Sequence, residues 1–369
     1  MLTMRIICAA VAALLSALAA AQTQDPPDKA ELRRQIGQSL VALLGGDDAR
    51  NVVERIAAVK PDGAISRNFD VVALSKAWFG ARIVPNPAPD CRTTQTPAGE
   101  FDQGLCLLEV GRREADQSGK SPAYSMLAYS KNVGLGDIVL ARRAAGMAEP
   151  TPAKVTDAAA YELARKFIDQ VGVPKSEVPL PPQGFLPVRS LAIGTPSDAG
   201  SSTSMTIQKV VSFPRAFAVP GGFPWLKDPR TGQVLGHVIA PGGATVAVND
   251  GGVQFASIEG WSDAQMDPNL DPRASKTVAE LTDEITEDLY GEGVRKVGSL
   301  SILIALRKAY PNPEDPNPPL CPVCGWLLPA VQVAVAPVGA GRLDKSAVVP
   351  PGMLRQYYLV KKGESAPPR

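Results

Sequence analysis

The chain has 369 residues, of which 38 are lysine or arginine and 37 are aspartate or glutamate. This length is sufficient for two or three domains, each with its own hydrophobic core. The balanced charge, with no cluster of basic residues, argues against a broad surface for nucleic acid, because such surfaces gather Lys and Arg to displace counterions. We therefore expect no nucleic acid partner.

The single histidine, His237, restricts the chemistry that the chain can carry. Histidine-rich metal sites are excluded, and a Ser-His-Asp arrangement would have to use this residue. No G-x-S-x-G pattern accompanies it, and its place in an apolar run favours a sheet-surface or satisfied buried histidine. We expect no catalytic residue, no cofactor and no bound metal, with a hydrolase based on carboxylates alone as a weaker alternative.

Residues Met1–Ala21 have the features of a secretory signal peptide. Arg5 precedes an apolar run, Ile6–Leu15, and small residues end the segment at Ala21. The run is shorter than the roughly 20 residues that a membrane-spanning helix needs. We therefore expect cleavage after Ala21, no membrane span in the mature protein, and a secreted or periplasmic location.

Residues 22–149 are predicted to form a small α+β unit. Apolar residues recur at helical spacing in Ala30–Leu44, and Ala49–Val59 reads as a second short helix. Three runs rich in strand-forming residues follow, and we expect them to pair as an antiparallel meander. These runs are Gly104–Arg113, Ala123–Ser130 and Leu135–Arg143.

A second α+β unit is predicted over residues 150–261, after the proline-containing linker that begins it. Thr156 is placed to cap a helix that ends near Gly172. Several strands should follow, separated by glycine- and proline-containing turns. The predicted strands are Phe185–Ile193, Met205–Phe213, Val234–Ala240, Ala244–Val248 and Val253–Ile258, with a break at Pro220–Pro224 and turns at Pro241–Gly243 and Asn249–Gly252.

The segments AAAYELARKFIDQVGVP, VSFPRAFAVPGGFPW and GHVIAPGGATVAVNDGGVQFASIEGW follow one another in this unit. In their order and spacing they resemble the PepSY and fungalysin/thermolysin-propeptide-like modules of exported bacterial proteins, over about Val155–Trp261. The resemblance implies a cystatin-like fold, in which one helix packs across an antiparallel sheet. It also implies a non-catalytic role, such as restraining a protease or binding a partner at the cell envelope.

Residues 262–362 repeat the order of one helix followed by strands. Thr277 and Glu280 have the spacing of a capping box. We expect a second, shorter copy of the same architecture, followed by a disordered tail over residues 363–369. The acidic residues of the helix are predicted to form a solvated face; they are Asp283, Glu284, Glu287 and Asp288. The predicted strands are Leu300–Tyr310, Leu327–Val338 and Leu354–Val360.

Four cysteines remain after removal of the signal peptide, and an even number in an exported protein favours disulfides. A bond between Cys91 and Cys106 would close a loop of about 15 residues and contribute ~3 kcal/mol on the chain-entropy model. Cys321 and Cys324 form a CPVCG motif, which favours a local structural disulfide. A redox-active dithiol and half of a zinc ribbon are the alternatives.

Together these patterns predict an exported α+β protein of helix-on-antiparallel-sheet units. We expect it to bind a protein or peptide partner in the envelope through sheet edges or loops. The alternative function is thiol–disulfide exchange by Cys321 and Cys324, which a labile bond would favour.

Overall fold

The computed structural model describes residues 25–62, 65, 73–74, 77–78, 90–96, 99–113, 124–130, 138–144, 152–181, 186–195, 203–228, 231–261, 264–295, 297–309, 325–337 and 354–361. The predicted signal peptide, residues 1–21, and the predicted tail, residues 363–369, lie outside these residues. The described helices are α2 (Pro27–Leu44), α3 (Arg50–Ala57), α5 (Asp157–Val171) and α6 (Val278–Gly291), with 3-10 turns η2 (Lys175–Glu177) and η3 (Pro272–Ala274). No described helix has the length and the apolar composition needed to cross a membrane.

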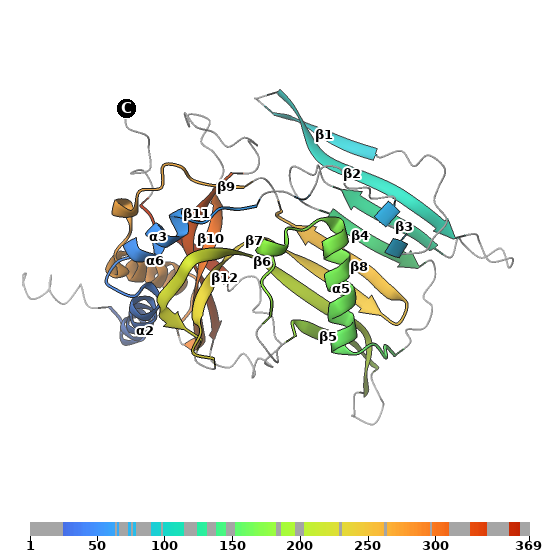
Figure 1. Cartoon of the computed structure of the whole chain (residues 1–369). Helices are drawn as coiled ribbons and strands as arrows, with labels where there is room; N and C mark the ends of the chain where they lie inside the picture. Colours follow the sequence, from blue (N-terminus) through green and yellow to red (C-terminus); the bar gives the residue numbers. More distant parts are fainter. Residues whose placement is uncertain are drawn as a thin grey trace, which may run out of the picture. The chain divides into compact units, whose positions relative to one another are not determined.

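The strands form a mixed, largely antiparallel sheet, so the protein belongs to the α+β class. Figure 1 shows them along the chain. Their bounds are β1 (Asp90–Thr96), β2 (Gly99–Arg113), β3 (Tyr124–Ser130), β4 (Ile138–Ala144), β5 (Val188–Thr195), β6 (Thr203–Lys227), β7 (Val234–Asn249), β8 (Gly252–Glu259), β9 (Gln265–Met266), β10 (Val297–Ala309), β11 (Trp326–Pro337) and β12 (Leu354–Tyr358).

The contacts of the chain divide it into two compact units of discontinuous segments. The smaller unit comprises residues 1–49, 276–303 and 332–357, and the larger unit comprises residues 50–275, 304–331 and 358–369. The domain boundaries expected from sequence, near residues 150 and 262, remain predictions.

The larger unit contains the meander predicted near the N-terminus and the strands of the second predicted unit. Antiparallel pairs join the strands in the order β1-β2-β3-β4-β8-β7-β6-β5. The arrangement is not wholly antiparallel, because Ala305 of β10 pairs in parallel with Ile239 of β7, and β9 pairs in parallel with β11.

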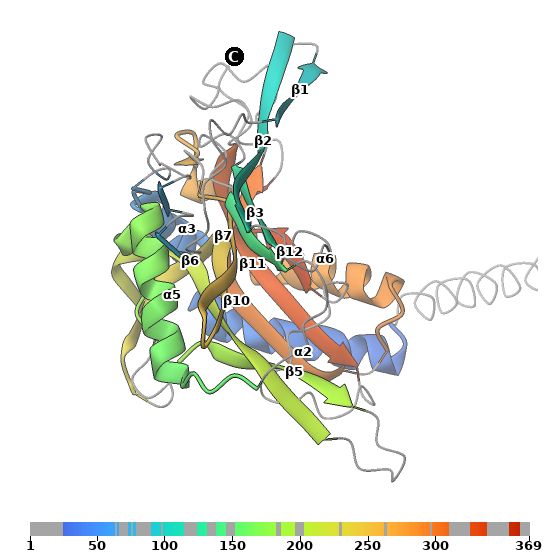
Figure 2. The same cartoon turned by 90° about the vertical axis from the view of Figure 1, so that its right-hand side faces the viewer.

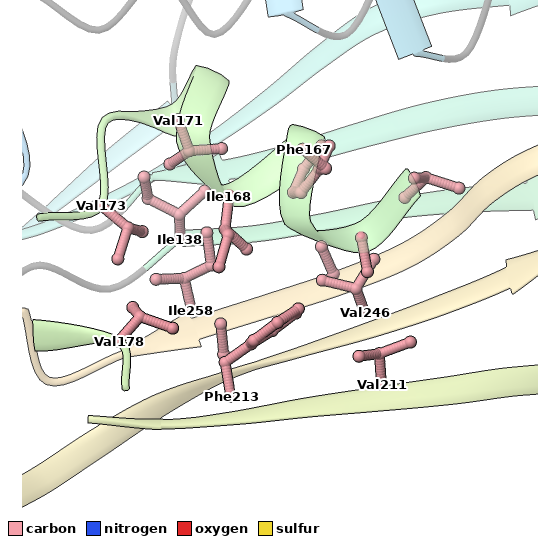
Figure 3. Close-up of a cluster of buried hydrophobic side chains, with 14 of the residues drawn as sticks. Ile138, Phe167, Ile168, Val171, Val173, Val178, Val211, Phe213, Val246 and Ile258 are labelled. Carbon is pink, nitrogen blue, oxygen red and sulfur yellow. The ribbon is translucent and has the colours of Figure 1, made fainter. Parts of the chain in front are cut away.

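Helix α5 covers one face of this sheet, as its sequence pattern predicts. At the start of the helix, the Thr156 hydroxyl accepts a hydrogen bond from the backbone amide of Ala159. At its end, Gly172 adopts a left-handed conformation with a φ of 85°. The buried side chains of α5 lie on one stripe and point toward the strands (Figure 3). They include Ala160, Ala164, Phe167, Ile168 and Val171, and they contact a layer that includes Val211, Phe213, Val246, Ala256 and Ile258.

Two predicted interruptions are wrong, because β6 and β7 are long continuous strands. The residues expected to form a turn, Pro241–Gly243, instead widen β7 into a bulge. Pro214 pairs with Gly243 and Ala216 pairs with Ile239, so one residue of β6 stands opposite three of β7. The break expected at Pro220–Pro224 is a second bulge, within β6. Glycine and proline mark both places, but strand pairing continues through them.

In the smaller unit, α2 and α6 lie side by side (Figure 2). The capping box of Thr277 and Glu280 is confirmed by both of its hydrogen bonds. The apolar stripes of both helices are fully buried; they comprise Leu32, Ile36, Leu40 and Leu44 of α2 and Leu281, Ile285 and Leu289 of α6. The helix followed by β10, β11 and β12 has the element order that the sequence predicts.

Candidate functional site

The predicted cysteine sites are placed only in part. Cys321 and Cys324 lie outside the described residues, so their disulfide, redox and zinc interpretations stay predictions. The backbones of Cys91 and Cys106 stand directly opposite each other in the register of β1 and β2. Opposed residues of antiparallel strands have Cα atoms about 4.5–5.5 Å apart, a separation that a disulfide can span. Their side chains are not described, and this bond also stays a prediction.

His237 lies in β7 and is exposed, opposite Ala218 of β6. No hydrogen bond or ion pair joins it to another described side chain. Its surroundings are those of a sheet-surface histidine. Among the described residues, no group of three or more His, Cys, Asp or Glu side chains is arranged to hold a metal ion.

The acidic face of α6 is exposed to solvent, as the sequence predicts, with side-chain exposures between 44% and 61%, and it also makes ion pairs and a hydrogen bond. Its four carboxylates all contact groups from other segments; they are Asp283, Glu284, Glu287 and Asp288. Glu287 lies 2.6 Å from Nζ of Lys29 in α2, and Asp288 accepts a hydrogen bond of 2.6 Å from the Tyr357 hydroxyl. Because the carboxylates are largely exposed, water screens each ion pair, and its contribution to stability is small. Through these contacts the carboxylates help to align α2, α6 and β12.

A buried ion pair, Glu177 with Arg215, lies where the bulge of β7 meets β6. Both side chains are 1% exposed, and Nε of Arg215 is 2.7 Å from Oε2 of Glu177. The other carboxylate oxygen of Glu177, Oε1, accepts a hydrogen bond of 2.9 Å from the backbone amide of Asp62. Arg215 also donates to the carbonyl of Gly260, and its guanidinium lies 5.8 Å from the centre of the Trp261 ring. The pair therefore ties η2, β6 and the end of β8 together.

Close backbone contacts surround this ion pair. A Cβ atom on Gly242 would lie 2.4 Å from the Glu259 carbonyl oxygen, and one on Gly260 would lie 2.7 Å from the Cα of Gly242. Both residues also have positive φ, so only glycine fits there. The pair is neutral overall and enclosed, which is the geometry of a structural junction.

Sequence reasoning missed Glu177 and Arg215, since the two are 38 positions apart and belong to no motif. The available signal was Pro214, because proline inside a strand often marks a bulge, and a bulge can redirect the next side chain inward.

The outer edge of β5 is the feature best suited to binding. β5 pairs with β6 on one side, and no described strand pairs with its other side. Figure 2 shows β5 along the outside of β6. An open strand edge presents backbone donors and acceptors that another extended chain can complete.

Hydrogen bonds identify which backbone groups of β5 face outward. The amide of Ser212 donates to the carbonyl of Pro187, so residues 187 and 212 form a hydrogen-bonded pair. Because such pairs alternate along antiparallel strands, Ser190 belongs to a non-hydrogen-bonded pair with Lys209. The N–H and C=O of Ser190 therefore point away from β6. The carbonyl of Val188 faces the same way, whereas its amide donates to Leu186.

The side chains along this edge are accessible. Ser190 and Ala192 are exposed, and Leu191 is 47% exposed. Lys209 reaches across to the Ser190 hydroxyl at 2.9 Å and to Asp157 of α5 at 2.8 Å. An extended segment can approach β5 without displacing any described strand.

Comparison with known proteins gives no relative: no family model, no curated protein and no solved structure matches the chain. Neither a family nor an activity is transferred to it from another protein.

Proposed function

We propose that this protein is a non-catalytic binding module that accepts an extended segment of a protein or peptide at the open edge of β5. The observation that carries the proposal is the outward direction of the Ser190 amide and carbonyl at a strand with no described outer neighbour. Strand addition of this kind uses main-chain hydrogen bonds for affinity and alternate side chains for specificity.

The edge offers enough groups for a weak, specific contact. One amide and two carbonyls of residues 188 and 190 face outward, and each hydrogen bond contributes about 0.5–1.5 kcal/mol net. The strand is already held in place by β6, so an incoming segment orders mainly itself. This arrangement favours reversible recognition of a flexible or extended partner.

The proposal includes a PepSY-like, cystatin-like character for residues 155–261 and a setting outside the cytoplasm. A single helix, α5, lying across antiparallel β6, β7 and β8 supports the first part. The pattern of Met1–Ala21 supports the second. N-terminal sequencing of the protein recovered from its natural host tests the export step, since removal of the signal would leave Gln22 first.

The binding edge is tested by one substitution and its matched control. Ser190→Pro removes the outward amide but no hydrogen bond between β5 and β6, whereas Ser190→Ala removes only the hydroxyl. Peptides selected from a phage-displayed library of random eight-residue sequences serve as probes. We expect Ser190→Pro to weaken their binding about ten-fold or more and Ser190→Ala to leave it within about two-fold.

Equal binding by the two variants would contradict the proposal. Hydrogen exchange of the unchanged protein gives a second measurement that does not depend on how the proline variant folds. On addition of a selected peptide, the amide of Ser190 should exchange more slowly, while amides of β8 should be unaffected. Unchanged exchange at β5 would also contradict strand addition there.

A further inference from the structure

The side chains of β5 alternate between two chemically different faces. Ser190 stands opposite Lys209, whose ammonium group binds Asp157 of α5, so these residues lie on the face that α5 covers. Arg189 and Leu191 therefore lie on the opposite face. A strand added at the edge of β5 would present every second side chain to the face that carries Arg189 and Leu191.

Arg189 places a positive charge on this face. No ion pair or hydrogen bond joins it to a described residue, in contrast to Lys209, which is held by Asp157. Its register neighbours are apolar: Arg189 pairs with Val210, Val210 with Ala247, and Ala247 with Phe255. The flanking residues of β6 on this face, Gln208 and Ser212, are polar but uncharged, so the attraction for a carboxylate brought next to this strand comes from the guanidinium of Arg189.

We infer that the segment accepted by β5 carries an acidic side chain beside Arg189 and an apolar side chain two residues away, beside Leu191. The inference rests on the proposed function and specifies its partner: an extended peptide with an acidic-x-apolar pattern. Opposite charges on neighbouring strands stabilise their pairing, and like charges oppose it. Leu191, 47% exposed, supplies the apolar contact.

A second copy of β5 does not fit this description. The strand reads VRSLAIGT and contains no acidic residue, so pairing two copies edge to edge leaves both Arg189 side chains without a carboxylate from the partner strand. The occupant is therefore a different segment.

The experiment selects peptides from the same random eight-residue library on the unchanged protein, on Arg189→Glu and on Arg189→Gln. We expect the unchanged protein to enrich Asp or Glu two residues from an apolar residue. Arg189→Glu should enrich Lys or Arg at that same position, and Arg189→Gln should show neither preference. An acidic peptide should bind the unchanged protein about five-fold or more tightly than its lysine counterpart, and added salt should reduce the difference.

The outcomes distinguish a failure of the acidic-partner inference from a failure of the proposed strand addition at β5. If the recovered peptides depend on the Ser190 amide but show no charge preference, strand addition stands and the acidic partner is excluded. If no peptide is recovered by any variant, the proposed function fails together with the inference. Circular dichroism of each variant checks that the substitutions leave the fold intact.

Discussion

Replacing Glu177 by glutamine should strongly destabilise the larger unit. The change preserves the size of the side chain and an oxygen for the Asp62 amide, but it removes the charge that balances Arg215. Both residues are 1% exposed, so water screens the pair very little. Breaking a buried ion pair by neutralising one member costs about 3–5 kcal/mol, because the other charge stays buried.

The double variant Glu177→Gln, Arg215→Met measures the interaction free energy between the two side chains. Each single change leaves one uncompensated charge, and together the two singles would sum to about 6–10 kcal/mol if they were independent. The double change leaves no charge, and its remaining cost is that of hydrogen-bonding groups that now face an apolar side chain, about 1–3 kcal/mol for an unsatisfied buried group. The double variant should therefore be more stable than either single variant.

Urea unfolding monitored by tryptophan fluorescence is the appropriate assay. All four tryptophans lie in the larger unit, at positions 78, 225, 261 and 326, so the fluorescence follows the unfolding of that unit directly. The reasoning would be refuted if Glu177→Gln lowered the free energy of unfolding by less than about 1 kcal/mol. It would also be refuted if the loss in the double variant equalled the sum of the losses in the two single variants.

Three further predictions concern the smaller unit. Gly37→Ala in α2 should raise the free energy of unfolding by about 0.5–1 kcal/mol, because alanine favours the helix and its Cβ would make an ordinary 3.5 Å contact with Oγ1 of Thr282; a loss of stability in far-ultraviolet circular dichroism would contradict this packing. Thr277→Ala should cost about 1 kcal/mol by removing the cap of α6, whereas Thr277→Ser should cost little, and hydrogen exchange of the first turn distinguishes them. Burial and the hydrogen bond to Asp288 raise the pKa of Tyr357 above its ordinary value of 10.0. Its stabilising contribution is therefore complete below about pH 10 and falls as the pH rises toward the folded-state pKa, so Tyr357→Phe should flatten the decline measured by urea unfolding above about pH 10.

The helices were predictable because their signals are local. Thr156 and Thr277 mark helix starts by the hydrogen bonds that their own side chains make, and Gly172 marks an end by its backbone conformation. Each signal acts within about one helical turn, so no knowledge of the distant chain was needed.

The sheet was predictable only in part, because strand pairing depends on distant residues. Gly242 has the positive φ of a turn glycine, yet β6 pairs with β7 on both sides of it and keeps the strand continuous. Which strand lies at an edge is also decided by pairing, and nothing in the sequence of β5 distinguishes it from an interior strand. The ion pair of Glu177 and Arg215 escaped prediction for the same reason.

The order in which the segments of the smaller unit occur along the chain has a consequence during synthesis. The stripe on α2 is complete by Leu44, but the helix that buries it starts at Val278. More than two hundred residues must emerge before the two surfaces can meet, and long-range closures of this kind are slow. During that interval the leucines of α2 are a natural target for a chaperone, and a chain that stops before α6 would keep them permanently open to aggregation.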